Sequence, residues 1–213
     1  MPAIDFAQVF IAFVVLLFSL TVHESAHAWT ADRLGDPTGR LLGRVSLNPL
    51  VHIDWIGTVF FPLMGLLGGG GFFGWAKPVP VNVGRLRRHR TDYMLVAAAG
   101  PASNMLIAIV AAAVLALLPR ATVVGDAEQV AEPLRRLLWI AMSLNVTLAV
   151  LNMLPIPPLD GGTVLGGLLP SALARRYDAL RPYGFIILLA LMVQGGFAYL
   201  IATPAQFILS WLQ

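Results

Sequence analysis

The side chains best suited to chemistry in this sequence are two histidines and a glutamate, in the run His23-Glu24-Ser25-Ala26-His27. On a helix, His23 and His27 are four residues apart and project from one face, so their imidazoles can share one metal ion. Glu24 lies beside them and is placed to activate a metal-bound water. The types and spacing therefore predict a zinc peptidase motif.

The motif lies at the end of an apolar stretch that begins near Phe6. A helix needs about 20 predominantly apolar residues to cross a bilayer, and this stretch is long enough. Ionisable groups at such depth are expensive to bury and indicate function. We expect a first span over residues 6–31. It resembles a signal peptide only superficially, because it lacks a basic n-region and an A-x-A-like cleavage site, and we expect it to be retained.

The composition is that of a membrane protein. Of 213 residues, 58% are hydrophobic and 12% are charged, whereas soluble domains carry about 25% charged residues. The mean hydropathy is +0.78. We expect one domain over residues 1–213, with its core in 6–165 and a C-terminal transmembrane region in 183–212. Because the chain has no cysteine, zinc must be held by His, Asp or Glu.

The basic residues indicate the topology. The net charge is only +3, but most cations gather in three groups, at 33–44, 77–90 and 175–181. Under the positive-inside rule these groups lie on the cytoplasmic side, which puts the N-terminus outside and the active site toward the cytoplasm. We interpret them as topology signals and expect no nucleic-acid partner.

The apolar pattern predicts an all-α polytopic membrane protein with about four to six transmembrane helices. Further spans are expected at 92–118 and 133–151, joined by an outside loop at 120–132. The region 183–212 is either one long span or a tight pair of short helices, since Gly195 and Gly196 lie in its middle.

A membrane-embedded irregular region is expected after the first helix. Residues 34–54 are too polar for a lipid-exposed helix, and residues 44–49 are predicted as a short extended strand. Residues 55–73 are apolar but rich in glycine, and positive charge flanks them on both sides. A re-entrant or surface-lying segment fits this pattern better than a full span.

Catalytic zinc usually has three protein ligands, so a third must come from elsewhere. The candidates in apolar context are His52, Asp54 and Asp160. Asp160 is the best of them, because it follows a proline-rich segment and precedes Gly161 and Gly162, which allow close backbone approach. The prolines forbid a regular helix before it, and we expect an extended chain there.

These motifs together resemble the site-2 protease family of intramembrane zinc metalloproteases (peptidase family M50), in its compact single-domain bacterial and archaeal form. His23 to His27 match the family's HExxH, and Asn152 through Gly161 match its second signature, an Asn followed by a proline-rich stretch and Leu-Asp-Gly. Residues 99–104 resemble its Gly-Pro-containing element, where Gly100 would permit close helix packing. Residues 39–54 also resemble the compact members, with departures at Trp55 and at residues 81–84.

The resemblance implies a role for each matching residue. His23, His27 and Asp160 would ligate one zinc ion per chain. Glu24 would be the general base and then the proton donor, and Asn152 would help to stabilise the oxyanion. The implied activity is a zinc metalloendopeptidase of the cell membrane that cleaves transmembrane segments in regulated intramembrane proteolysis. Family substrates include anti-sigma factors and signal-peptide remnants.

Other interpretations of these residues stay open. Asp160 could cap a helix in a Pro-Gly turn, and Asn152 could be a helix C-cap. His52 could make a structural hydrogen bond or act in gating or water access, and Asp54 is expected as an N-cap. Asn104 could approach the site or bond between helices. The rival to a peptidase is a metal carrier, or an inactive homologue that only binds transmembrane helices. Neither the oligomeric state nor the particular substrate follows from the sequence.

Overall fold

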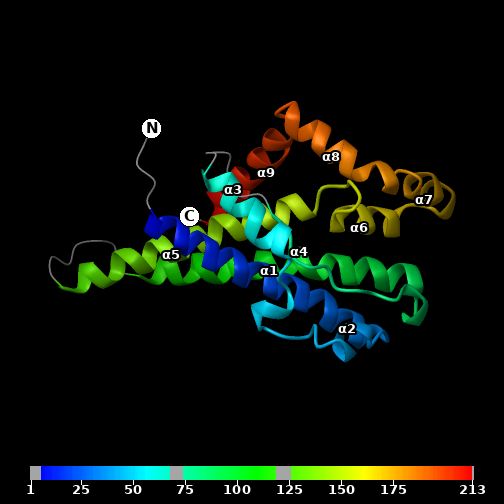
Figure 1. Cartoon of the computed structure of the whole chain (residues 1–213), viewed down its shortest axis with the longest axis horizontal. Coiled ribbons are helices and arrows are strands. Elements are labelled where there is room, and N and C mark those ends of the chain that lie inside the picture. Colours follow the sequence, from blue (N-terminus) through cyan, green and yellow to red (C-terminus); the bar gives the residue numbers. More distant parts are fainter. Residues whose placement is uncertain (1–5, 68–73, 119–125, 213) are drawn as a thin grey trace.

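The computed structural model describes residues 6–67, 74–118 and 126–212, and within these ranges it is helical, with no β-strand. The expectation of an all-α fold is confirmed. The α-helices are α1 (Phe6–Leu34), α2 (Thr38–Leu41), α3 (Phe61–Leu67), α4 (His89–Leu117), α5 (Asp126–Asn152), α6 (Asp160–Leu168), α7 (Ser171–Asp178), α8 (Gly184–Val193) and α9 (Gly196–Leu212) (Figure 1).

Three of these helices are long and apolar enough to cross a membrane: α1, α4 and α5 from Glu132 onward. They agree with the spans predicted from the sequence, and the chain is a membrane protein. For 183–212 the sequence left one long span or a tight pair of short helices open, and the structure has the pair, α8 and α9. The break lies at Gly195, whose φ of +72° is accessible to glycine at little cost.

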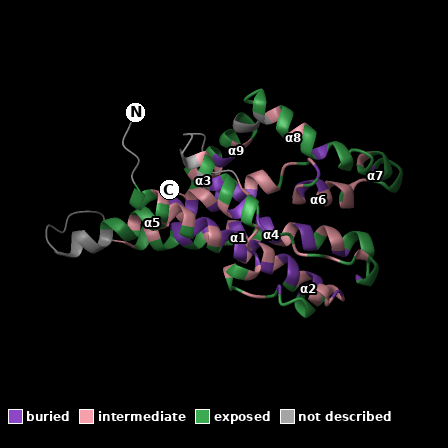
Figure 2. Cartoon of the chain, viewed as in Figure 1, coloured by how far each residue is buried: buried purple, intermediate pink, exposed green. Residues whose placement is uncertain are grey.

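Helix α4 packs against α1, α5 and α6, and it therefore lies at the centre of the arrangement. Small side chains make this possible: Ala108 of α4 is fully buried against Val146 of α5 and Ala205 of α9. Buried residues follow the contact between α1 and α4, and exposed residues lie along the outer faces (Figure 2). Large apolar side chains such as Phe10 and Leu106 are exposed on those faces, as expected next to lipid.

Two local expectations in the second half of the chain were wrong. Helix α5 begins at Asp126 and extends into the predicted loop at 120–132, where Ala, Glu and Gln favour helix. The proline-rich segment before Asp160 does not run extended but turns, with Ile156 N–H donating to the Leu154 carbonyl at 2.8 Å. Proline excludes a helix there, but its fixed φ suits turns equally well.

The region after α1 is irregular, as predicted, but residues 44–49 form no strand. The chain makes a single 3₁₀ turn over Pro49–Val51 and a π-helical turn over Trp55–Phe60 before α3. Asp54 caps the π-helical turn, accepting from the N–H groups of Ile56 and Gly57, so its predicted N-cap role is confirmed. Residues 68–73 lie outside the described residues, and the re-entrant character of 55–73 stays a prediction.

Candidate metal centre

The site lies where one face of α1 contacts one face of α4. On α1, His23 and His27 are one turn apart, and on α4 Gly100 faces them. A Cβ placed on Gly100 would lie 2.5 Å from the Cε1 atoms of His23 and His27 and from Nε2 of His27. The two helices can therefore approach at this depth only because residue 100 has no side chain. The expectation that Gly100 permits close helix packing is confirmed.

Asp160 reaches the histidines from α6, where it is the first residue of the helix. A Cβ on Gly161 would run into the carbonyl groups of Met153 and Leu154. The glycine after Asp160 thus lets the start of α6 rest directly on the preceding turn. Asp160 does not cap the helix: its Oδ2 lies 3.1 Å from Nε2 of His23 and 3.4 Å from Nε2 of His27.

The three facing atoms form a set that could hold a metal ion, because the two Nε2 atoms are themselves only 3.0 Å apart. Both histidines are buried, with 4% and 8% exposure. Ligand bonds of about 2.0–2.2 Å in a tetrahedral zinc site separate the ligand atoms by about 3.3 Å. The observed separations fit that geometry.

The hydrogen bonds on the other side of each ring leave the Nε2 atoms directed at Asp160. Nδ1 of His23 is 2.6 Å from Oδ1 of Asn104, and Nδ1 of His27 is 2.7 Å from the carbonyl of Val96. Carbonyl oxygens only accept, so each Nδ1 carries the proton and each Nε2 has a lone pair. Oδ2 of Asp160 accordingly has no hydrogen-bond donor. In the neutral tautomers three buried lone pairs face one another, an arrangement that a bound cation would stabilise.

Glu24 is held by the segment of residues 74–82, called here the strap. The backbone N–H of Val79 donates to Oε2 of Glu24 at 2.9 Å. The strap is itself fixed, since Lys77 N–H donates to the His52 carbonyl and the Arg44 guanidinium donates to the Lys77 carbonyl. The carboxylate next in sequence to the first histidine is therefore oriented by protein backbone.

The remaining predicted residues have different surroundings. Asn152 ends α5, and its Nδ2 donates to the Leu148 carbonyl at 3.0 Å, so among the described hydrogen bonds it does not join the three metal-facing residues. His52 is 2% exposed and bonds to the Ser46 carbonyl. Burial lowers the pKa of His52, and the nearby charge of Arg44 lowers it further. The structure therefore gives His52 the first of its two predicted roles, a structural hydrogen bond.

Two residues that matter here were missed by sequence reasoning. Asn145 of α5 is fully buried and accepts from Nδ2 of Asn104 at 2.8 Å. An amide in the middle of an apolar span was the available signal, because polar groups at that depth are rare. Arg44 was counted among the topology charges, yet it is 6% exposed and its guanidinium donates to the Lys77 carbonyl of the strap.

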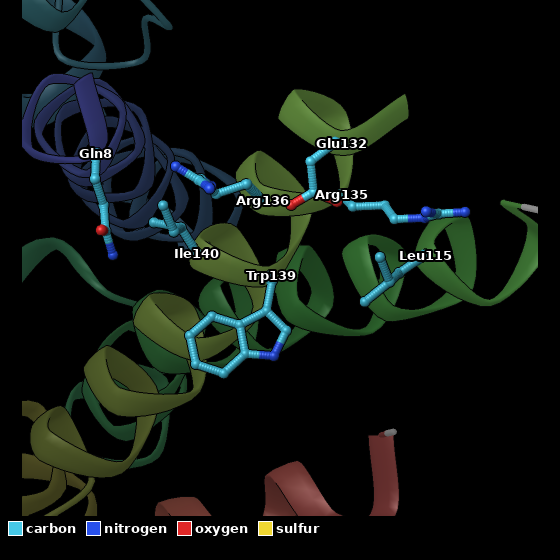
Figure 3. Close-up of a pocket in the computed structure, with 7 residues that line it drawn as sticks. All are labelled: Gln8, Leu115, Glu132, Arg135, Arg136, Trp139 and Ile140. Carbon is cyan, nitrogen blue, oxygen red and sulfur yellow. The ribbon is translucent and has the colours of Figure 1, made fainter. Parts of the chain in front are cut away.

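One cavity, of about 520 Å³, lies apart from this site. It lies at the other end of the long helices and is lined by Gln8 of α1, Leu115 of α4 and Arg135 and Trp139 of α5 (Figure 3). Its lining contains no histidine and only one carboxylate, Glu132. It has no set of side chains that could hold zinc.

A buried His-His-Asp group in an all-helical membrane protein is typical of membrane metalloproteases. The model of Peptidase family M50 matches residues 11–193, and the chain belongs to this family. It is 36% identical over 180 residues to "Putative zinc metalloprotease YwhC" of Bacillus subtilis, covering 84% of this chain and 78% of that protein. The chain is a zinc metalloprotease.

Two further relatives carry the name "Putative zinc metalloprotease Rip2". The one from Mycolicibacterium smegmatis is 31% identical, with 83% of this chain and 64% of the relative covered. The one from Mycobacterium tuberculosis H37Rv is 30% identical, with 88% and 69% covered. The chain thus spans about two thirds of these longer relatives. No solved structure matches the chain.

Proposed function

We propose that this chain is a multi-pass intramembrane endopeptidase that cleaves transmembrane segments of membrane proteins near the cytoplasmic side of the bilayer. His23, His27 and Asp160 would hold the zinc. The observation that carries the proposal is the convergence of three metal-ligating atoms, Nε2 of His23, Nε2 of His27 and Oδ2 of Asp160, which lie 3.0–3.4 Å from one another. It occurs beside a carboxylate at the end of a span-length helix.

When bound, zinc lowers the pKa of a water and polarises the scissile carbonyl. Glu24 would accept the proton of that water and deliver it to the leaving nitrogen. The N–H of Val79 keeps the carboxylate of Glu24 in place while leaving its second oxygen available. Asn152 would turn its amide from Leu148 toward the oxyanion, a donor role that typically contributes about 100- to 1000-fold in rate.

The segment after Arg44 is not a strand, but its outward backbone N–H groups favour substrate binding by strand addition. Ser46 turns both backbone groups inward: its carbonyl accepts from Ser25 and His52, and its N–H donates to Ser25. The N–H groups of Val45 and Leu47 have no protein acceptor in the described part of the chain. An apolar groove of about 300 Å³ lies between these residues and α1.

An unwound substrate segment would therefore pair with residues 44–47 and present its carbonyl to the site. Val45→Pro removes one free N–H and should slow cleavage while zinc stays bound. Unchanged cleavage by this variant would contradict strand addition. The substrates proposed are single-span proteins such as anti-sigma factors or signal-peptide remnants.

The test of the function compares wild type with Glu24→Gln in detergent, measuring zinc content and cleavage of a model transmembrane substrate together. Asp32→Asn is the matched control, because it neutralises another carboxylate of α1 that pairs only with Arg40 in the described contacts. We expect all three proteins to bind zinc and only Glu24→Gln to lose cleavage. Zinc binding without cleavage of several substrates by wild type would instead favour a metal carrier or a helix-binding homologue.

A further inference from the structure

A chain of hydrogen bonds between buried amides leads away from the metal centre across three helices. It joins Asn104 of α4, Asn145 of α5 and Ser19 of α1, all of them fully buried. At one end it reaches Nδ1 of His23, 2.6 Å from Oδ1 of Asn104. At the other end it reaches the backbone carbonyl of Ala141, 2.8 Å from Nδ2 of Asn145.

The backbone end determines which way each amide faces. Nδ2 of Asn145 uses one proton for the Ala141 carbonyl and the other for the Ser19 hydroxyl, each at 2.8 Å. Oδ1 of Asn145 must then face Asn104, which presents Nδ2 to it at 2.8 Å. The second proton of that Nδ2 points to the Ser19 carbonyl at 3.4 Å. Two backbone carbonyls therefore specify the same orientation of Asn104.

That orientation selects the tautomer of the neutral His23 ring. With Nδ2 committed, Asn104 can offer only Oδ1 to the ring, so Nδ1 of His23 carries the proton and, in the neutral ring, Nε2 keeps its lone pair. A flipped Asn104 would donate to Nδ1, leave the proton on Nε2 and block the metal side of the ring. His27 needs no such chain, because its acceptor, the Val96 carbonyl, cannot flip.

We infer that Asn104, oriented by Asn145 and Ser19, is a positioning residue that holds His23 in the Nδ1-protonated tautomer with Nε2 directed at the zinc. The inference rests on the zinc centre of the proposed function. Outer-shell partners of this kind typically change metal affinity by about 10- to 100-fold. Losing the acceptor should therefore weaken zinc binding without removing any ligand.

The experiment measures the zinc dissociation constant of the full-length protein in detergent by competition with a chelator. We expect Asn104→Leu, which lacks the acceptor, to bind zinc about 10- to 100-fold more weakly. Asn104→Asp should recover part of this loss, because a carboxylate still accepts from Nδ1 although it no longer donates to Asn145. Asn145→Leu should weaken binding less, since the Ser19 carbonyl still orients Asn104. The Asn145→Leu variant keeps the contact between Asn104 and His23, so it tests the chain of hydrogen bonds even if Asn104→Leu does not fold.

Thr21→Val is the matched control. Thr21 is a 2% exposed polar residue of α1, and its hydroxyl bonds only to Leu17 of the same helix in the described contacts, so zinc affinity should not change. The inference is overturned if Asn104→Leu binds zinc like wild type, or if Asn104→Asp is as weak as Asn104→Leu, the result expected of a packing role alone. A wild-type protein without zinc affinity would remove the proposed function itself, and this inference with it.

Discussion

Replacing Gly100 by alanine tests the geometry of the metal centre without a substrate. The added methyl would lie 2.5 Å from atoms of both histidine rings, whereas carbon atoms pack best at about 3.5–4.0 Å. The shortfall of about 1 Å must be met by moving α4 or by turning the rings. Metal ligands tolerate about 0.5 Å of displacement before function suffers.

The energetic effect can be bounded. Overpacking of this kind costs about 1–3 kcal/mol, while alanine gains about 1 kcal/mol over glycine within a helix. The net change in the free energy of unfolding should be small, because these two terms partly cancel. Zinc affinity should fall by about 10- to 100-fold, since about 1.4 kcal/mol of ligand misplacement corresponds to each factor of ten.

The assay is chelator competition on purified Gly100→Ala, with thermal unfolding recorded with and without zinc. Gly166→Ala is the control, because a Cβ there meets only the Tyr177 ring at 3.8 Å, an ordinary contact. We expect the control to bind zinc like wild type. Equal zinc affinity of Gly100→Ala and wild type would refute the claim that residue 100 sets the helix approach at the metal.

Three other predictions concern carboxylates. Asp160→Asn keeps the shape but removes the charge, and should weaken zinc binding by more than the about 10- to 100-fold typical of an outer-shell partner; retention of zinc in dialysis checks this. Asp54→Ala removes an N-cap and should lower the free energy of unfolding by about 1 kcal/mol with zinc content unchanged, measured by denaturant titration. Burial raises the pKa of Asp36, but bonds from Thr38 and the Asn82 N–H, with the charge of Arg85, outweigh it and hold that pKa below its usual value. Asp36 therefore stabilises the fold above about pH 4 and ceases to as the pH falls below it. The difference in melting temperature between wild type and Asp36→Asn should narrow in acid; an unchanged difference down to pH 2 would contradict this.

Most of the candidate metal centre could be predicted from local features of the sequence. The spacing of His23 and His27 and the flanking apolar run are local features, and the periodicity of a helix converts them directly into one face at membrane depth. The glycines after Asp160 likewise signalled a close approach, which the structure contains. The prediction of an extended chain at the prolines before it was wrong. The fixed φ of proline fits both an extended segment and a turn, and only the hydrogen bonds of the fold select the turn.

What the sequence determined by itself is the chemistry and its depth: two imidazoles and a carboxylate in spans long and apolar enough for a bilayer. Tertiary structure alone decided what holds those groups. The two candidate roles of Asn104, approaching the site and bonding between helices, prove to be one role, because its amide touches His23 on one side and Asn145 on the other. Asn145 lies 41 residues away along the chain, and no local pattern reports a contact that depends on how two helices pack.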